Sequence, residues 1–489
     1  MGGFAMNCSE PIRRNARILP DAVAIERSDG STITYAALDR TLDALAHRLR
    51  EIGLCAGHAV AIVTADGHRY MVTLLALARI GVSGAASNLP PALAEMVLSD
   101  QAPGTVNHPR VVQLDALWPA GGLAGDTPPV PMHDDGSAIL VLSASSGTTT
   151  GAPKVVPVSH DLAARRVALR IMNPPMFAGT RHCCFVSVFA GFGLVAVLRT
   201  LWTGFTVIEP NLNAEQLASW LVTSRVSHIS ISPIGLRKLL NVLPADGVAC
   251  DVRTIEIGGG VLPMSTYELA QRRLPAMVIA TYGSTETGNV ATAPFAAVCG
   301  RPDAAGYVLP GVTVQVVDAD DHPLPAGEEG TLRVRGGGTA AGYRGNDAAA
   351  ARTFRDGWVY THDRAILDGD GLLRVTGRID DVIVVDGVKF NPQALEEALM
   401  RLADLREVAV FGAHDAKGLT AICAAIVPNA AIDADEFHAR CRERLGAGAP
   451  SFIMHMRELP RNAMGKVQRT ELARIAGEAS RSRRGPPAA

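Results

Sequence analysis

Residues 142–154 read LSASSGTTTGAPK and are the most informative stretch of the chain. They follow the apolar run 138–142, are rich in hydroxyl side chains and glycine, and end on Lys154. Backbone N–H groups freed by glycine, hydroxyl donors and one ammonium group are what a polyphosphate requires. The Gly-Lys-Ser/Thr ending of a Walker A loop is absent, and a flexible linker would have no reason to follow an apolar strand and close on Pro-Lys. The stretch therefore predicts a phosphate-binding loop of another class.

Strand and helix patterns alternate on both sides of this loop. Near the start, the spacing of Leu38, Leu42, Leu45 and Leu49 predicts a helix between apolar strand runs. Downstream, the runs HISISP, RTIEIGG and MVIATYG predict strands that end in proline, glycine or hydroxyl residues. Functional loops tend to lie at such strand ends. Short β runs with turns follow at about residue 310 and predict a mostly antiparallel section before Trp358.

The C-terminal part of the chain returns to an αβ alternation and is long enough for a separate domain. We therefore expect a mixed α/β (α+β) chain of two domains. Residues 1–378 are expected to form a large domain of αβ-layered sheets plus the short β section, and residues 379–489 a small α+β domain.

The composition excludes several classes of protein. The 489 residues contain 46 Lys and Arg against 48 Asp and Glu, which argues against disorder and against a nucleic-acid surface driven by net positive charge. The eight cysteines form no CxxC pair, so neither a zinc site nor a disulfide framework is expected, and a reducing compartment fits best. From the N-terminal residues we expect neither a signal nor a lipid anchor, and the longest uncharged run, residues 183–198, is shorter than the ~20 residues of a spanning helix. A cytoplasmic protein without a membrane span is expected.

A second motif, TYGSTETG at residues 281–288, follows the apolar run MVIA. A strand thus delivers an aromatic ring, a tight turn, hydroxyls and a carboxylate to one loop. An aromatic ring can stack on a base, and a carboxylate can hold magnesium beside phosphate. An ordinary polar turn is the alternative. Just upstream, Gly258-Gly259-Gly260 ends another predicted strand.

Further motifs stand toward the C-terminus. WVYTHD at residues 358–363 presents Asp363, and a carboxylate can accept hydrogen bonds from two ribose hydroxyls at once. GRIDD follows at residues 377–381, and LPRNAMGKVQR, with Lys466, at residues 459–469. The alternatives for their charged side chains are a solvated turn and a solvated lysine.

In their order along the chain, these motifs resemble those of the adenylate-forming superfamily, which contains acyl- and aryl-CoA ligases, peptide-synthetase adenylation domains and firefly-type luciferases. The resemblance extends from ITYAALDR at residues 33–40 to Lys466. The family's phosphate loop, Ser-Gly-Thr-Thr-Gly-x-Pro-Lys-Gly, is matched with one additional Thr and with Val155 in place of the last glycine. His362 replaces the glycine of the family's Thr-Gly-Asp triplet. Together with the additional Thr and a shortened segment at residues 90–137, this suggests an outlying member of the family. No carrier-protein segment is recognised after Lys466, so a free-standing member is expected.

The resemblance implies a role for individual residues. The expected ATP- or AMP-binding residues are Ser146, Gly147, Thr148, Thr149, Thr150, Gly151, Lys154, Gly258, Gly259, Gly260, Tyr282, Gly283, Ser284, Asp363 and Arg378. The expected acid-binding residues are Phe189, Ala190, Gly259 and Ser284. Lys466 and Thr285 are expected to be catalytic and Glu286 to hold Mg²⁺. Asp380 is expected to be the hinge about which the small domain turns, and Gly387 to line the tunnel for a pantetheine thiol.

The activity implied by the resemblance is that of an AMP-forming carboxylate ligase. Such an enzyme uses ATP and Mg²⁺ to convert an acid into an acyl-adenylate, releases pyrophosphate, and transfers the acyl group to coenzyme A. Two alternatives stay open: an adenylating enzyme that loads the phosphopantetheine of a separate carrier protein, and a non-catalytic nucleotide- or acyl-binding protein. Residues 187–193 contain no acidic side chain to pair with an α-ammonium group, and Ala190 stands where many acyl-CoA ligases have histidine. An aryl or acyl acid without an amino group is therefore expected; the acid, the acceptor, the pathway and the oligomeric state are not specified by the sequence.

Overall fold

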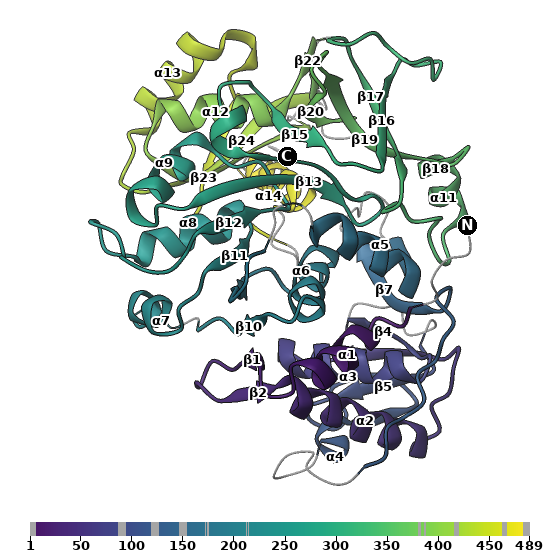
Figure 1. Cartoon of the computed structure of the whole chain (residues 1–489). Coiled ribbons are helices and arrows are strands. Elements are labelled where there is room, and N and C mark those ends of the chain that lie inside the picture. The colour runs from purple at the N-terminus through teal and green to yellow at the C-terminus, as the bar shows by residue number, and fades with distance from the viewer. Residues whose placement is uncertain are drawn as a thin grey trace. The chain divides into compact units, whose positions relative to one another are not determined.

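The computed structural model describes residues 6–86, 94–118, 127–145, 154–171, 173, 176–211, 213, 215–379, 383–385, 388–414, 420–461 and 467–482 (Figure 1). The chain divides into two compact units. The first comprises Met1–Gln315, Arg333–Thr361 and Leu367–Arg374, and the second comprises Val316–Leu332, His362–Ile366 and Val375–Ala489. The domain boundary expected after residue 378 stays a prediction.

One sheet of the first unit has the strand order β6-β5-β3-β4-β7-β8. Its strands are β3 (Ala59–Val63), β4 (Ser83–Ala86), β5 (Met96–Ser99), β6 (Val111–Gln113), β7 (Ile139–Ser145) and β8 (Lys154–Ser159). They pair in parallel except for β7 and β8, whose antiparallel register sets Ser145 opposite Lys154. The expected phosphate loop therefore connects two paired strand ends.

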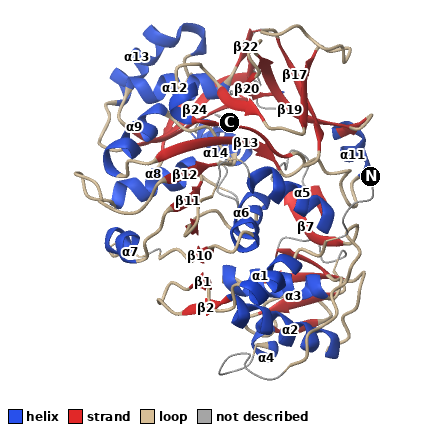
Figure 2. Cartoon of the chain, in the orientation of Figure 1, coloured by secondary structure: helices blue, strands red, loops and turns tan. Residues whose placement is uncertain are grey.

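Helices α1 (Glu10–Ile18), α2 (Tyr35–Glu51), α3 (Gly67–Arg79) and α4 (Leu114–Leu117) accompany this sheet (Figure 2). Helix α2 begins after Thr34, whose hydroxyl accepts a hydrogen bond from the Ala37 N–H at 3.2 Å. It buries all four leucines of the pattern that predicted a helix here, so that prediction is confirmed. Every residue of β3 is buried, as is typical of a parallel strand covered on both faces.

A second sheet contains, in spatial order, β15-β14-β13-β12-β11-β9-β10-β1-β2. These strands are β1 (Val23–Glu26), β2 (Thr32–Thr34), β9 (Arg181–Cys184), β10 (Thr206–Ile208), β11 (His228–Ile231), β12 (Thr254–Ile257), β13 (Met277–Ser284), β14 (Gly288–Pro294) and β15 (Ala304–Val308). The associated helices are α5 (His160–Ile171), α6 (Gly191–Trp202), α7 (Leu217–Thr223), α8 (Pro233–Val242), α9 (Met264–Arg273) and α10 (Phe295–Val298). From β13 to β1 the neighbouring strands are parallel, so their carboxyl ends share one edge of the sheet.

The β-rich section expected after residue 310 is present. It consists of β16 (Val312–Val317), β17 (Glu329–Gly336), β18 (Phe354–Arg355), β19 (Trp358–Leu367) and β20 (Leu372–Arg378), with α11 (Asp347–Thr353) between β17 and β18. Strand β15 pairs antiparallel with both β14 and β20, and β18 pairs antiparallel with β19.

The second unit has its own sheets and core. Its remaining elements are β21 (Ile383–Val385), β22 (Val388–Phe390), α12 (Pro392–Leu402), β23 (Leu405–His414), β24 (Thr420–Pro428), α13 (Ala434–Leu445), the 3-10 turn Gly446–Gly448, β25 (Phe452–His455) and α14 (Arg469–Ser482). Strand β24 pairs antiparallel with β23 and parallel with β25. Leu399 of α12 and Phe437 of α13 are buried against this sheet. The mixed α/β class predicted from the sequence is confirmed.

Candidate active site

The candidate site in the first unit lies at the carboxyl edge of the parallel strands. Gly258 directly follows β12, and Tyr282, Gly283 and Ser284 end the neighbouring strand β13. Ligands of open α/β sheets bind at this edge because the loops there diverge. Two segments that the sequence singled out separately are thus brought together.

The turn between β13 and β14 is held by its own side chains. The Ser284 hydroxyl accepts hydrogen bonds from the N–H groups of Glu286 and Thr287, each at 3.2 Å, and the Ser284 N–H donates to Thr287 Oγ1 at 3.0 Å. Gly283 faces the backbone of β14, where an added Cβ would lie closest to the Gly288 carbonyl oxygen and 2.9 Å from the carbonyl carbon. Only glycine fits this position, so the turn presents Thr285 and Glu286 in one fixed arrangement.

Glu286 is positioned by residues from a distant segment. Its Oε1 accepts a hydrogen bond from the Tyr343 hydroxyl at 2.8 Å, and its carbonyl oxygen accepts from the Ala340 N–H at 2.8 Å. Lys154 Nζ lies 5.5 Å from the centre of the Tyr343 ring. Lys154 and Glu286, predicted from two separate motifs, therefore both approach Tyr343, and a carboxylate fixed in this way has the chemistry of a magnesium ligand.

Arg166 of α5, like Tyr343, lies in this region but belongs to none of the motifs recognised in the sequence. It is buried, and its Nη2 donates to the Thr285 carbonyl oxygen at 2.8 Å while its Nε donates to the Gly338 carbonyl oxygen at 2.9 Å. Burial lowers the pKa of Arg166 to about 10, although the charge of Glu286 acts in the opposite direction.

The expected acid-binding segment precedes α6. The Ala190 N–H donates to the Ser187 carbonyl oxygen at 3.0 Å, and the Phe189 ring packs edge-on against Tyr70 with ring centres 4.6 Å apart. Phe192, which the sequence did not single out, packs against Gly258: an added Cβ on Gly258 would lie 2.7 Å from Phe192 Cζ. The aromatic ring at Gly258 is therefore that of Phe192.

Cys184 ends β9 and precedes this segment. Its thiol donates to the Val186 carbonyl oxygen at 3.3 Å, and burial raises the pKa of Cys184 to about 11. All eight cysteines lie within the described residues and are free.

Asp363 and Arg378 meet within the second unit. Arg378 Nε lies 3.5 Å from Asp363 Oδ1. The preceding residue, His362, has a φ of 60°, which lies in the left-handed region that favours glycine. This backbone conformation explains why the adenylate-forming superfamily has glycine at the matching position.

The other expected site residues lie outside the described residues. They are Ser146, Gly147, Thr148, Thr149, Thr150 and Gly151 of the phosphate loop, together with Asp380, Gly387 and Lys466. Their roles stay predictions.

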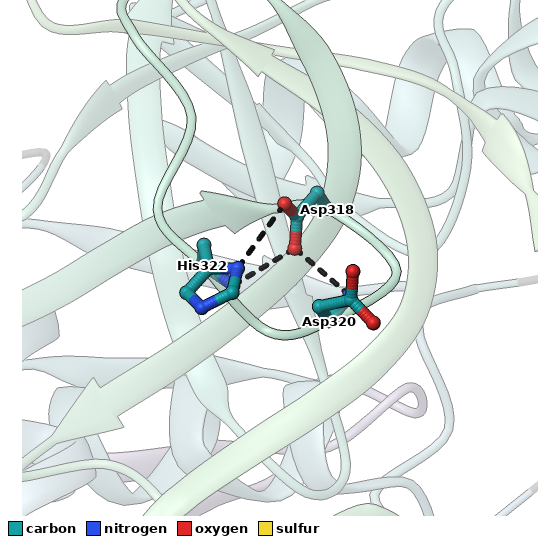
Figure 3. Close-up of side chains that lie close together, drawn as sticks. All are labelled: Asp318, Asp320 and His322. Carbon is teal, nitrogen blue, oxygen red and sulfur yellow. Dashed lines mark hydrogen bonds and ion pairs between the residues drawn. The ribbon is translucent and has the colours of Figure 1, made fainter.

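One further group has the chemistry of a metal site. Asp318, Asp320 and His322 offer ligand atoms within 4.8 Å of one another in the turn between β16 and β17 (Figure 3). Asp318 Oδ1, however, already accepts hydrogen bonds from the N–H groups of Asp320 and His322, each at 2.9 Å. These bonds make the cluster an exposed turn stabilised by an aspartate side chain.

Within the part of the chain that the structure describes, no helix combines the length and the apolar character needed to cross a membrane.

The chain belongs to the AMP-binding enzyme family, whose sequence model matches residues 12–344, and residues 394–466 match the C-terminal domain of AMP-binding enzymes. Feruloyl-CoA synthase of Amycolatopsis sp is 28% identical over 496 residues, with 96% of this chain and 99% of the relative covered. A 2-succinylbenzoate–CoA ligase of Bacillus licheniformis is 27% identical over 487 residues, with 94% and 98% covered.

A solved structure shows the same fold. O-succinylbenzoate coenzyme A synthetase from Bacillus subtilis, in complex with ATP and magnesium ion, superposes with a TM-score of 0.83 at 22% identity, covering 94% of this chain and 98% of that chain. The matches to the two family models confirm the expectation of an adenylate-forming enzyme. The class of activity is likewise confirmed as that of an AMP-forming carboxylate ligase of the acyl-CoA synthetase type.

Proposed function

We propose that the acid is an apolar aryl carboxylic acid without an α-amino group, activated at the carboxyl edge of β12 and β13. The observation that carries this proposal is the Phe192 ring lying against Gly258. An aromatic wall beside a glycine offers a flat apolar surface, and residues 185–193 supply no carboxylate to pair with an ammonium group. The relatives named above are CoA ligases of aryl acids, which agrees with such a substrate.

The chemistry has two steps. A carboxylate oxygen attacks the α-phosphorus of ATP, a new P–O bond forms, and pyrophosphate leaves with the electron pair of the broken P–O bond. The thiol sulfur of coenzyme A then attacks the carbonyl carbon, AMP leaves, and the thiol proton passes to solvent. The first step is needed because a carboxylate itself has only an oxide to lose.

The chain's own residues serve the first step by opposing charge repulsion between carboxylate and α-phosphate. Thr285 lies in the β13–β14 turn, where Arg166 holds its carbonyl oxygen. We assign it a hydrogen bond to the α-phosphate. Lys466 is proposed to bring a positive charge to the same oxygens.

Magnesium fits the donor set of this turn. Glu286 offers a carboxylate whose orientation is fixed by Tyr343, and oxygen is the ligand that Mg²⁺ prefers. When bound, the ion would neutralise phosphate charge.

Coenzyme A is the proposed acceptor, with a carrier protein as the alternative. We place the reaction in the cytoplasm, where eight free cysteines are expected to persist.

The test is mass spectrometry of the protein with ATP, Mg²⁺, coenzyme A and benzoate, cinnamate, ferulate, indole-3-acetate, octanoate or phenylalanine. Aryl-CoA thioesters and AMP are expected, and Glu286→Gln serves as the control for background. Products from octanoate or phenylalanine alone would contradict the aryl acid, and an aryl-AMP without thioester would indicate a carrier protein.

A further inference from the structure

A cluster of buried polar side chains adjoins the contact between Phe192 and Gly258, and the proposed reaction does not use it. Each member is at most 3% exposed. The Glu256 cluster consists of Arg170 of α5, His182 of β9, Arg199 of α6, His228 and Ser230 of β11, and Glu256 of β12.

Glu256 is the centre of the cluster. Its Oε1 lies 2.6 Å from Arg170 Nη2, and its Oε2 lies 3.1 Å from Arg199 Nη2 and accepts a hydrogen bond from Ser230 Oγ at 3.2 Å. Burial alone would raise the pKa of Glu256, but the charges of Arg170 and Arg199 hold that pKa well below its usual range. A single ionised carboxylate therefore fixes two buried guanidinium groups, and its removal would leave them without this counter-charge.

The histidines complete the cluster in their neutral form. Burial lowers the pKa of both His182 and His228. His182 shares hydrogen bonds with Thr200 Oγ1 at 2.6 Å and with Ser230 Oγ at 3.0 Å, and His228 Nε2 lies 3.2 Å from Arg199 Nη2. Arg199 is thus held by both Glu256 and His228.

Arg170 connects this cluster to Phe192 by two contacts. Its Nη1 donates to the Phe192 carbonyl oxygen at 2.8 Å, and its guanidinium carbon lies 4.3 Å from the centre of the Phe192 ring. A buried cation over an aromatic face is strongly attracted to it. The Phe192 ring therefore contacts both Gly258 and the guanidinium group of Arg170.

Strand β12 connects the Glu256 cluster to the Phe192 ring. It carries Glu256, which anchors Arg170, and it runs directly into Gly258, on which the ring packs. The position of the ring relative to the sheet edge is consequently set from one strand.

We propose that Arg170 and Glu256 are positioning residues that fix the Phe192 ring as the inner limit of the acid pocket, so that Phe192 determines how long an acid is accepted. The proposal rests on the proposed function, because the pocket is taken to be the acid site. A purely structural cluster would change the stability of the protein but would not change the preference among acids.

The test compares cinnamate with 4-phenylcinnamate in ATP–pyrophosphate exchange. Phe192→Ala is expected to raise the ratio of kcat/KM for the longer acid over the shorter one by roughly tenfold or more, because pocket contacts of this size discriminate at that level. The KM for ATP should stay within about twofold, which separates an effect on the acid pocket from general damage. An unchanged ratio in Phe192→Ala would overturn the proposal.

Two variants of Arg170 test the positioning role. Arg170→Met removes the cation, and Arg170→Lys keeps a charge beside Glu256 but cannot reproduce the planar donor fork. Both are expected to shift the acid ratio in the same direction as Phe192→Ala, and Arg170→Lys stays informative if Arg170→Met fails to fold. The matched control is Arg69→Met, which removes an arginine 5.8 Å from the Trp118 ring centre and should leave the ratio unchanged.

A second measurement is independent of turnover. With 4-fluorophenylalanine at position 192 alone, the ¹⁹F resonance is expected to shift on Arg170→Lys and to stay in place on Arg69→Met. If the unmodified enzyme activates no acid, the proposed function fails while this measurement still decides whether Arg170 fixes the ring. An identical ¹⁹F resonance in Arg170→Lys would overturn the positioning role.

Discussion

Replacement of Gly283 by alanine tests whether the β13–β14 turn builds the nucleotide site. An alanine Cβ would lie 2.9 Å from the Gly288 carbonyl carbon and 3.0 Å from Asn289 Cα, and closer still to the Gly288 oxygen. Ordinary contact begins near 3.4 Å, and all three atoms belong to the backbone of β14, so none can rotate away. Overpacking usually costs about 1–3 kcal/mol, and we expect about 3 kcal/mol here because the hairpin itself must open.

The same displacement should act on catalysis. Gly283 stands between Tyr282 and Ser284, so a hairpin that opens by about half an ångström or more moves the turn that carries Thr285 and Glu286. Misplacement on the scale of 1 Å can cost about 100-fold, and we expect kcat/KM for ATP to fall roughly 10- to 100-fold.

The assays are urea unfolding and ATP–pyrophosphate exchange on Gly283→Ala. Gly300→Ala is the matched control, because a Cβ at Gly300 meets nothing within 4 Å. Wild-type values for Gly283→Ala in both assays would refute the reasoning. A less stable protein with an unchanged kcat/KM would mean that the hairpin matters for folding alone.

Four further outcomes are expected. Tyr343→Phe removes the hydrogen bond to Glu286 and should raise the Mg²⁺ concentration needed for half-maximal ATP–pyrophosphate exchange. Glu286→Gln should raise that concentration further. An unchanged Mg²⁺ dependence in both variants would exclude Glu286 as the metal ligand. Lys466→Ala should strongly lower acyl-AMP formation with the unfolding midpoint unchanged, and near-wild-type adenylation would exclude Lys466 from the mechanism. Asp380→Pro should impair one half-reaction more than the other, whereas equal losses would count against a hinge. Burial lowers the pKa of His160 to about 4, with His133 adding to the effect, so the unfolded chain takes up the proton first as the pH falls below 6.5. His160 alone should then lower the free energy of unfolding by about 2 kcal/mol between pH 7 and pH 5. In urea titrations the drop should therefore be about 2 kcal/mol smaller in His160→Asn than in the unmodified protein, and equal drops would disprove this origin.

The parts of the fold that sequence reasoning predicted are those determined by local patterns. The leucine spacing in residues 38–49 predicted α2 because a helix repeats its buried positions every three to four residues. Apolar runs ending in glycine predicted β12 and β13 in the same way. The spatial order of the parallel strands has no local signature, since neighbours such as β1 and β10 are far apart along the chain.

The residues of the candidate site likewise fall into those that a local motif reveals and those that it does not. Thr285 and Glu286 belong to a contiguous motif and could be recognised in the sequence. Arg166 could not, because its partner Thr285 lies 119 positions away and the guanidinium meets a backbone oxygen that any residue would supply. Phe192 was overlooked because its importance arises from Gly258 and Arg170, which only folding brings to it.

The buried thiol of Cys184, at the end of β9, bears on how such an enzyme avoids being acylated by its own acyl-adenylate. A mixed anhydride acylates any thiolate within reach, and Cys184 stands only six positions before Ala190. With a pKa of about 11, roughly one Cys184 side chain in ten thousand is ionised at pH 7. Burial therefore keeps this thiol protonated and unreactive toward an acyl-adenylate, which leaves the acyl group for an incoming thiol.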